Sequence, residues 1–173
     1  MTKRLLPLVG VLIGLTGLAL PFVAARAVAK DDAAAEYAID DYDLNWNVMK
    51  SDDFSMTITK TQDTTKIHLD NRLERLTMEP KDAEAVGAAL KKTDAEYAAL
   101  KGSDTDKSDE VDAGTYKVTF YWTVKYGFYI SVRSGERFAM DHVQIERKQA
   151  NEASKYLVQA TKMAAYLDAK VKL

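Results

Sequence analysis

Basic and aromatic side chains interleave along one face of a β-hairpin predicted in the second half of the chain. The set, called here the basic-aromatic face, comprises Lys117, Tyr121, Lys125, Tyr129 and Arg133. Tyrosine rings stack on bases and cationic side chains neutralise phosphates in single-strand binders, while Tyr and Arg also suit contacts with proteins. Tyr, Thr and Lys are equally ordinary residues of a solvated sheet face. The residue types therefore leave three interpretations: a solvated face, a protein contact or a nucleic-acid contact.

Residues that usually carry catalysis or bind metals are scarce. The chain has no cysteine, and its two histidines, His68 and His142, have only single weak companions in Asp70 and Glu146. Asp141 beside His142 has no visible nucleophile or third orienting group. No nucleophile elbow, phosphate loop or dinucleotide glycine pattern occurs. We therefore expect no enzyme activity, no cofactor and no metal site.

Residues 1–29 differ from the rest of the chain. A basic start is followed by an apolar stretch at 5–25 and by small residues around Ala27 and Ala29. This order is typical of a secretory signal peptide cleaved after one of those alanines. An uncleaved membrane anchor is the alternative, since about 20 apolar residues span a bilayer. We expect the remaining chain to be periplasmic or secreted or, if the anchor is kept, to be held at the inner membrane with its domain outside the cytoplasm. Without cysteines it has no disulfides.

The charge of the remaining chain is mildly acidic. Three of the 24 basic residues and none of the 26 acidic residues lie in residues 1–29. Residues 30–43 are acidic and lack apolar periodicity, so we expect a flexible leader there. A protein that binds nucleic acid or anionic lipid usually has a basic excess. The charge balance therefore favours a protein partner and restricts any nucleic-acid contact to a local patch.

The segment 44–101 predicts strands followed by one long helix. Apolar and polar residues alternate at 44–48 and 54–58, and shorter strand patterns follow, the last with a change of phase after Leu73 that suggests a bulge. From Pro80 onward the apolar spacing changes to three and four, which predicts a helix that ends near Lys101.

The segment 102–113 is acidic and poor in apolar residues, so we expect a connector there. Strand patterns return after Gly114, and residues 147–171 predict a second long helix. A three-residue loop at 125–127 places Val124 opposite Phe128, Trp122 opposite Ile130 and Phe120 opposite Val132. By the same logic a turn at 134–136 places Phe138 opposite Val132 and Met140 opposite Ile130.

An internal repeat supports this division. A shift of 67 positions aligns two sets of apolar residues: Leu73, Leu76, Met78, Ala83, Val86, Leu90 and Leu100 with Met140, Val143, Ile145, Ala150, Ala153, Leu157 and Leu167. We expect a single α+β domain at 44–173 with pseudo-twofold symmetry. It contains units 44–101 and 114–171, each with three to four antiparallel strands and one long helix, joined by the linker 102–113.

This duplicated strands-then-helix order, together with the basic-aromatic hairpin, resembles the Whirly and Pur families of single-stranded nucleic-acid binders. The resemblance covers about residues 44–171 and concerns topology, because no Whirly-type Lys-Gly-Lys-Ala-Ala-Leu signature occurs in the chain. It implies the fold of those families and single-strand binding through the hairpin face.

Taken together, the patterns predict an exported, non-catalytic binding or assembly module of the bacterial cell envelope. Its partner is expected to be another protein or a second copy of itself, met through an exposed sheet face or sheet edge. The alternative is an exported single-stranded nucleic-acid-binding protein that uses the basic-aromatic face. Contact with a membrane is expected only through residues 5–25, if these are not removed.

Overall fold

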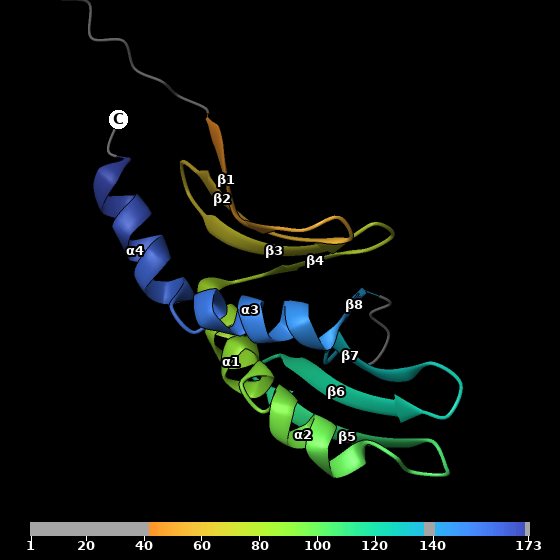
Figure 1. Cartoon of the computed structure of the whole chain (residues 1–173). Coiled ribbons are helices and arrows are strands. Elements are labelled where there is room, and N and C mark those ends of the chain that lie inside the picture. The colour runs from red at the N-terminus through yellow and green to blue at the C-terminus, as the bar shows by residue number, and fades with distance from the viewer. Residues whose placement is uncertain (1–41, 137–140, 172–173) are drawn as a thin grey trace, which may run out of the picture. The chain divides into compact units, whose positions relative to one another are not determined.

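Two successive units of strands followed by helices make up the computed structural model, which describes residues 42–136 and 141–171 (Figure 1). The first unit contains β1 (Asp43–Lys50), β2 (Phe54–Thr61), β3 (Thr65–Asn71), β4 (Arg75–Met78), α1 (Pro80–Leu90) and α2 (Thr93–Leu100). The second contains β5 (Lys107–Ala113), β6 (Tyr116–Thr123), β7 (Gly127–Ser134), β8 (His142–Ile145), α3 (Arg147–Leu157) and α4 (Ala160–Lys170). The predicted α+β class with two repeats is confirmed. The predicted signal peptide and nearly all of the predicted leader lie outside the described residues.

Each unit folds its strands into a four-stranded antiparallel sheet. The strand orders are β1-β2-β3-β4 in the first sheet and β5-β6-β7-β8 in the second. Side chains alternate between a buried inner face and a solvated outer face, as the period of two requires. Buried inner-face residues such as Met56 and Ile67 in the first sheet, and Phe120 and Ile130 in the second, are almost fully excluded from solvent.

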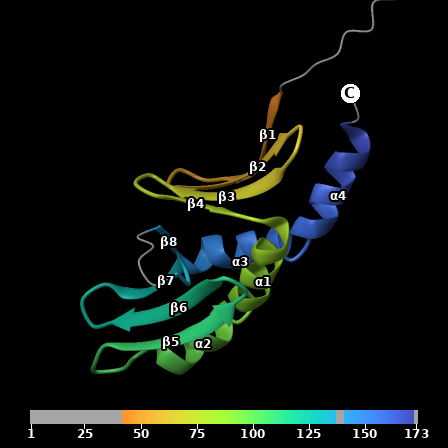
Figure 2. The ribbon, with the colours of Figure 1, turned by 180° about the vertical axis from the view of Figure 1, so that it is seen from behind.

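Three helices pack against the sheet of the other unit: α1 and α2 against the second sheet, and α4 against the first. Figures 1 and 2 show α1 and α2 beside β5 and β6, whereas α4 runs beside the first sheet. Tyr97 of α2 meets Phe128 of β7 edge to face, with 5.3 Å between ring centroids. Asp168 of α4 reaches the first sheet, where its Oδ1 lies 3.0 Å from Nζ of Lys60 and accepts a hydrogen bond of 3.3 Å from Thr65. Neither unit therefore completes its own core.

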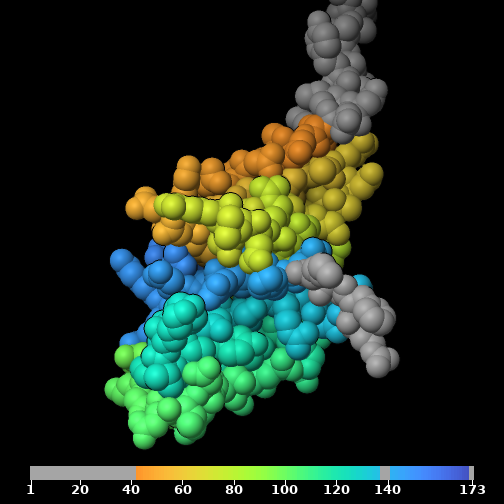
Figure 3. Space-filling model, turned by 90° about the vertical axis from the view of Figure 1, so that its right-hand side faces the viewer, coloured from red at the N-terminus to blue at the C-terminus, as the bar shows by residue number. Residues whose placement is uncertain are grey.

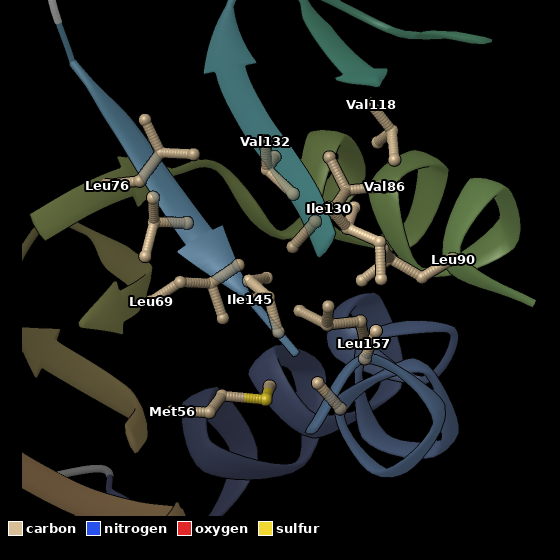
Figure 4. Packing of buried hydrophobic residues seen from close by; sticks show 14 of the residues in the cluster. Met56, Leu69, Leu76, Val86, Leu90, Val118, Ile130, Val132, Ile145 and Leu157 are labelled. Atoms are coloured by element: carbon tan, nitrogen blue, oxygen red, sulfur yellow. The ribbon is translucent and has the colours of Figure 1, made fainter. Parts of the chain in front are cut away.

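The core joins apolar residues from both units in one continuous cluster (Figure 4). Helices α1 and α3 cross at Gly87, where a β-carbon would lie only 2.6 Å from Cβ of Leu157. This close approach lets Val86 and Leu90 reach Ile130 and the rest of the shared cluster.

The repeat is visible in equivalent elements. The bounds of β8 and α3 lie 67 positions after those of β4 and α1. The preceding strands have smaller offsets: 63 from β3 to β7, since Ile67 pairs with Met78 and Ile130 with Ile145, and 62 from β2 to β6, since Ile58 pairs with Ile67 and Phe120 with Ile130. The connection from β7 to β8 is accordingly four residues longer than that from β3 to β4.

Each predicted long helix is in fact two helices. The first pair is separated at residues 91–92 and the second at 158–159. In the first unit Thr93 is fully buried, and its hydroxyl donates a hydrogen bond of 2.6 Å to the carbonyl oxygen of Leu90. That bond satisfies a helix-end acceptor, so the chain changes direction without leaving a polar group unpaired.

Strand β5 corrects the prediction of a connector at 102–113. Residues 107–113 pair with β6 in continuous antiparallel register and complete a fourth strand for the second sheet. The strand is predominantly acidic because it lies at the end of the sheet, where much of it faces water.

The predicted register of the β6–β7 hairpin is wrong by two residues. Phe120 lies opposite Ile130 and Trp122 opposite Phe128, so the three-residue loop is 124–126. Val124, expected opposite Phe128, lies in this loop and is 64% exposed. A shift of two keeps every strand side chain on its predicted face.

The fourth strands also differ from the prediction. Leu73 lies in the β3–β4 turn, 92% exposed, so the change of phase marks a turn and not a bulge. In the second sheet, Val143 lies opposite Val132 and Ile145 opposite Ile130, in the places expected for Phe138 and Met140. Phe138 and Met140 themselves lie outside the described residues. The bulge that the structure shows is in β1, between Asn47 and Met49.

Candidate binding face of the second sheet

Strands β6 and β7 bring together four of the five predicted side chains. Tyr121 lies opposite Tyr129, and their rings stack with centroids 4.9 Å apart and planes inclined by 16°. Four residue pairs further along the sheet, and on the same face, Lys117 lies opposite Arg133. The hairpin therefore has a tyrosine pair near its tip and a cationic pair near its base, both on the outer face.

An acidic residue of β5 neutralises the cationic pair. The Glu110 carboxylate accepts hydrogen bonds from Lys117 at 2.5 Å, Arg133 at 2.9 Å and Thr119 at 3.2 Å. The hydrogen bonds from Lys117 and Arg133 lower the pKa of Glu110 to about 2. Asp112 adds a second carboxylate 3.5 Å from Lys117. The base of the face is therefore charge-balanced, and its cations are already committed to partners within the sheet.

Lys125 does not share this face. It lies in the loop at the hairpin tip, with its ammonium 4.7 Å from the ring centroid of Tyr126. Tyr126 is itself 72% exposed. The loop therefore presents a cation and an aromatic ring at the end of the hairpin, separate from the Tyr121–Tyr129 pair.

An open hollow of about 410 Å³ adjoins the hairpin tip. It lies between the β3–β4 turn and the β6–β7 loop, both of which are visible on the side of the molecule drawn in Figure 3. Leu73, Tyr126 and Phe128 line it together with polar residues such as Asn71 and Gln144. Its mixed lining and wide opening suit contact with a surface better than enclosure of a small molecule.

Glu110 is not among the predicted site residues, because residues 102–113 were expected to form a connector. A signal was present: Ser108, Glu110 and Asp112 alternate with Val111 and Ala113 immediately before β6. Read as a strand, this alternation places the acidic side chains beside Lys117 on the outer face, as the pairing shows.

The two histidines lie at ordinary polar contacts. Nδ1 of His68 is 2.9 Å from the Thr77 hydroxyl, and partial burial, helped by nearby Arg75, lowers the pKa of His68. Nε2 of His142 lies 3.0 Å from the Glu74 carboxylate. Within residues 42–136 and 141–171, no group of three or more His, Asp or Glu side chains is arranged to hold a metal ion.

Among the described helices, none has the length and apolar character needed to cross a membrane. The apolar stretch at 5–25 belongs to the part of the chain that the structure does not describe.

The chain matches no known family model and no curated protein. Among solved structures it is similar to a chain from a guideRNA-binding protein complex bound to a gRNA, with 14% identity and a TM-score of 0.26. The match covers 77% of this chain and 95% of that chain. A likeness at this level carries no argument about function.

Proposed function

We propose that the protein is an exported, non-catalytic binding or assembly module of the bacterial cell envelope, which contacts a protein partner through the outer face of its second sheet. The chemistry of residues 1–29 supports export. The proposed contact centres on the stacked Tyr121–Tyr129 pair and is bordered by the ion-paired Lys117, Arg133 and Glu110.

The charge balance of the face is the observation that carries the proposal. A surface meant for phosphates keeps its cations available, whereas here Glu110 engages both Lys117 and Arg133. Aromatic rings surrounded by paired charges match the composition of protein interfaces, in which Tyr and Arg are enriched and polar groups form a rim.

The test is the native mass of the assembly that contains the chain, extracted gently from the cell envelope. We expect a mass far above that of two chains, and we expect Tyr121→Asp to reduce it to the mass of the chain alone or of a pair. Thr59→Asp is the matched control, because Thr59 holds the corresponding outer-face position of the first sheet, next to Ile58 as Tyr121 is next to Phe120. A wild-type mass of only one or two chains would contradict the proposal.

One observation favours a second candidate, a single-stranded nucleic-acid binder. The Tyr121–Tyr129 pair is a partly exposed aromatic platform, and Lys125 stands at the nearby hairpin tip. Such platforms stack successive bases in single-strand binders, and the topology resembles that of the Whirly and Pur families.

Titration with a labelled oligo(dT) or oligo(U) distinguishes the two candidates. A nucleic-acid binder would lose affinity steeply between 50 and 200 mM salt and in Tyr121→Ala. Glu110→Gln is the diagnostic variant, because it releases Lys117 and Arg133 for phosphates and would strengthen binding several-fold. Absence of binding in both the wild type and Glu110→Gln would eliminate this candidate.

A further inference from the structure

The free edge of the first sheet differs from an ordinary protected edge. Strand β1 ends the sheet, and within the described residues it pairs only with β2. Its charged residues, Asp43 and Lys50, stand at its two ends, and the positions between them are uncharged. The equivalent end strand of the second sheet, β5, carries the exposed charges of Lys107, Asp109 and Glu110. Charged residues along an edge discourage further strand pairing, and β1 lacks them between its two ends.

An apolar groove accompanies the open edge. Trp46 of β1 and Ile58 of β2 face Met163, Tyr166 and Leu167 of α4 across a groove of about 260 Å³. Trp46 is only half-buried and Tyr166 is 62% exposed. Exposed aromatic and aliphatic side chains next to unpaired main-chain groups are the two requirements of a strand-addition site.

We propose that β1 pairs with β1 of a second copy of the chain, in antiparallel orientation about a twofold axis at Trp46. The proposal concerns a different surface from the second-sheet face and does not depend on the protein partner proposed there. It would join two first sheets into one continuous eight-stranded sheet and place the two Trp46-lined grooves side by side.

The sequence of β1 is self-complementary in this register. Trp46 meets its own copy on the inner face, and Asn45 meets Asn47 on the outer face. Beyond Asn47, the bulge between Asn47 and Met49 adds one residue to each strand. That extra residue brings Leu44 opposite Met49 on the inner face and Asp43 opposite Lys50 on the outer face.

The bulge determines whether Asp43 of one copy lies opposite Lys50 of the other. Without it, each Asp43 would lie opposite Met49, and an outer-face residue would meet an inner-face residue. With it, every directly opposed pair lies on one face, and each end of the paired strands carries an Asp–Lys pair of opposite charge. The residues of β1 are therefore complementary to those of a second β1, which makes a second copy of the chain the expected partner at this edge.

Cysteine cross-linking tests the register in the full chain, held in non-ionic detergent. The chain has no cysteine of its own, so introduced thiols are the only ones present. Directly opposed antiparallel residues have Cα atoms about 4.5 to 5.5 Å apart, within disulfide range. A mixture of Asn45→Cys and Asn47→Cys chains should form covalent dimers, whereas each variant alone should form few, because identical positions are two residues out of register.

The matched control is the corresponding pair on β5. Ser108→Cys and Glu110→Cys stand 63 positions after Asn45 and Asn47, on the same face of an edge strand. Their mixture should give no covalent dimer. Equal cross-linking at β1 and β5, or equal cross-linking of Asn45→Cys alone and in the mixture, would overturn the proposed register.

Charge reversal with mass measurement by sedimentation supplies a second test that no loss of folding can mimic. Asp43→Lys and Lys50→Asp should each raise the dimer dissociation constant several-fold, while the double variant should restore it. Trp46→Asp, which copies the residue found at Asp109, should raise it more than tenfold while the far-ultraviolet circular dichroism remains unchanged. A wild-type chain that sediments as a monomer at about 50 µM would refute the proposal, as would failure of the double variant to recover.

Discussion

The two sheets share one scaffold but use different residues at equivalent places. Trp46 lies opposite Ile58 on the inner face of the first sheet, and Asp109 lies opposite Phe120 at the same place in the second. Two residues beyond Ile58, Lys60 is buried against Asp168 of α4, whereas the equivalent Trp122 packs on the core. The first sheet thus has a buried lysine at this inner-face position and an apolar residue on its edge strand, and the second sheet has the reverse.

This difference separates positions that hold the fold from positions that are free to specialise. The central inner-face positions are apolar in both sheets, because they meet the helices that cross between the units. The edge strands β1 and β5 each pair with one neighbouring strand within the described residues, so the sheet constrains their residues less than it constrains those of the central strands. The differences between β1 and β5 therefore mark positions that are free to take on different surface roles.

The largest expected effect concerns Trp122. Its indole Nε1 donates a hydrogen bond of 3.1 Å to the carbonyl oxygen of Ser103, and its ring packs on the core. Trp122→Ala should lower the free energy of unfolding by about 3 kcal/mol, measured by urea denaturation. Tyr121→Ala, on the outer face, should cost less than about 1 kcal/mol. Reversed sensitivities would contradict the assignment of inner and outer faces.

The helix crossing predicts the next effect. A β-carbon at Gly87 would lie 2.6 Å from both Cβ of Leu157 and the main-chain nitrogen of Val158. Gly87→Ala should therefore destabilise the fold by about 2 kcal/mol, seen as a lower Tm. Ser154 holds the equivalent place in α3 and already has a β-carbon, so Ser154→Ala should cost less than about 1 kcal/mol. Similar losses at both sites would argue against an asymmetric crossing of the two helices.

A smaller effect is expected at the ion pair between the buried Lys60 and the exposed Asp168. Asp168→Ala leaves the Lys60 ammonium without its carboxylate partner and should cost about 1 to 2 kcal/mol. Lys60→Met, which makes this position apolar like Trp122, should leave the unfolding free energy unchanged or raise it. Denaturation of both variants with the wild type checks the pair, and a large loss in Lys60→Met would show that the charge itself is required.

The smallest effect is a dependence on pH. The pKa of Glu110 is about 2 in the folded chain, below its ordinary value of about 4.5. The stability that this carboxylate contributes is thus fully present above pH 4.5 and is lost as the pH falls toward 2. Between these limits wild-type stability should fall more steeply than that of Glu110→Gln, measured by urea denaturation at several pH values. Parallel curves would mean that the ion pairs contribute nothing.

Much of the scaffold was predictable because buried positions in strands and helices recur with a fixed spacing in the sequence. The alternation in β2, β6 and β7 and the three-four spacing of both helical segments gave the correct classes and faces. The hairpin register was not predictable, because a shift of two residues leaves every side chain on the same face. The helix breaks at 91–92 and 158–159 contain no proline or glycine, and only the packing of the units requires them.

The composition of the candidate face was predictable, but its electrostatics were not. Tyr121 and Tyr129 were correctly placed on one face by alternation alone. The neutralisation of Lys117 and Arg133 depends on Glu110. Glu110 belongs to an edge strand, β5, whose many charged residues are typical of a loop. An edge strand is hard to recognise in a sequence. Much of it faces water, so its residues need not alternate between apolar and polar types.

The exchange of helices between the units also sets the order in which the chain can fold. Thr65 and Asp168, which join the first sheet to α4, are 103 residues apart in the chain. During synthesis the first sheet emerges early, yet the part of its inner face that α4 covers stays exposed until the last helix has been made. Contacts of such long range impose a high contact order and slow folding. We therefore expect a chain that lacks α4 to leave the first sheet incompletely covered.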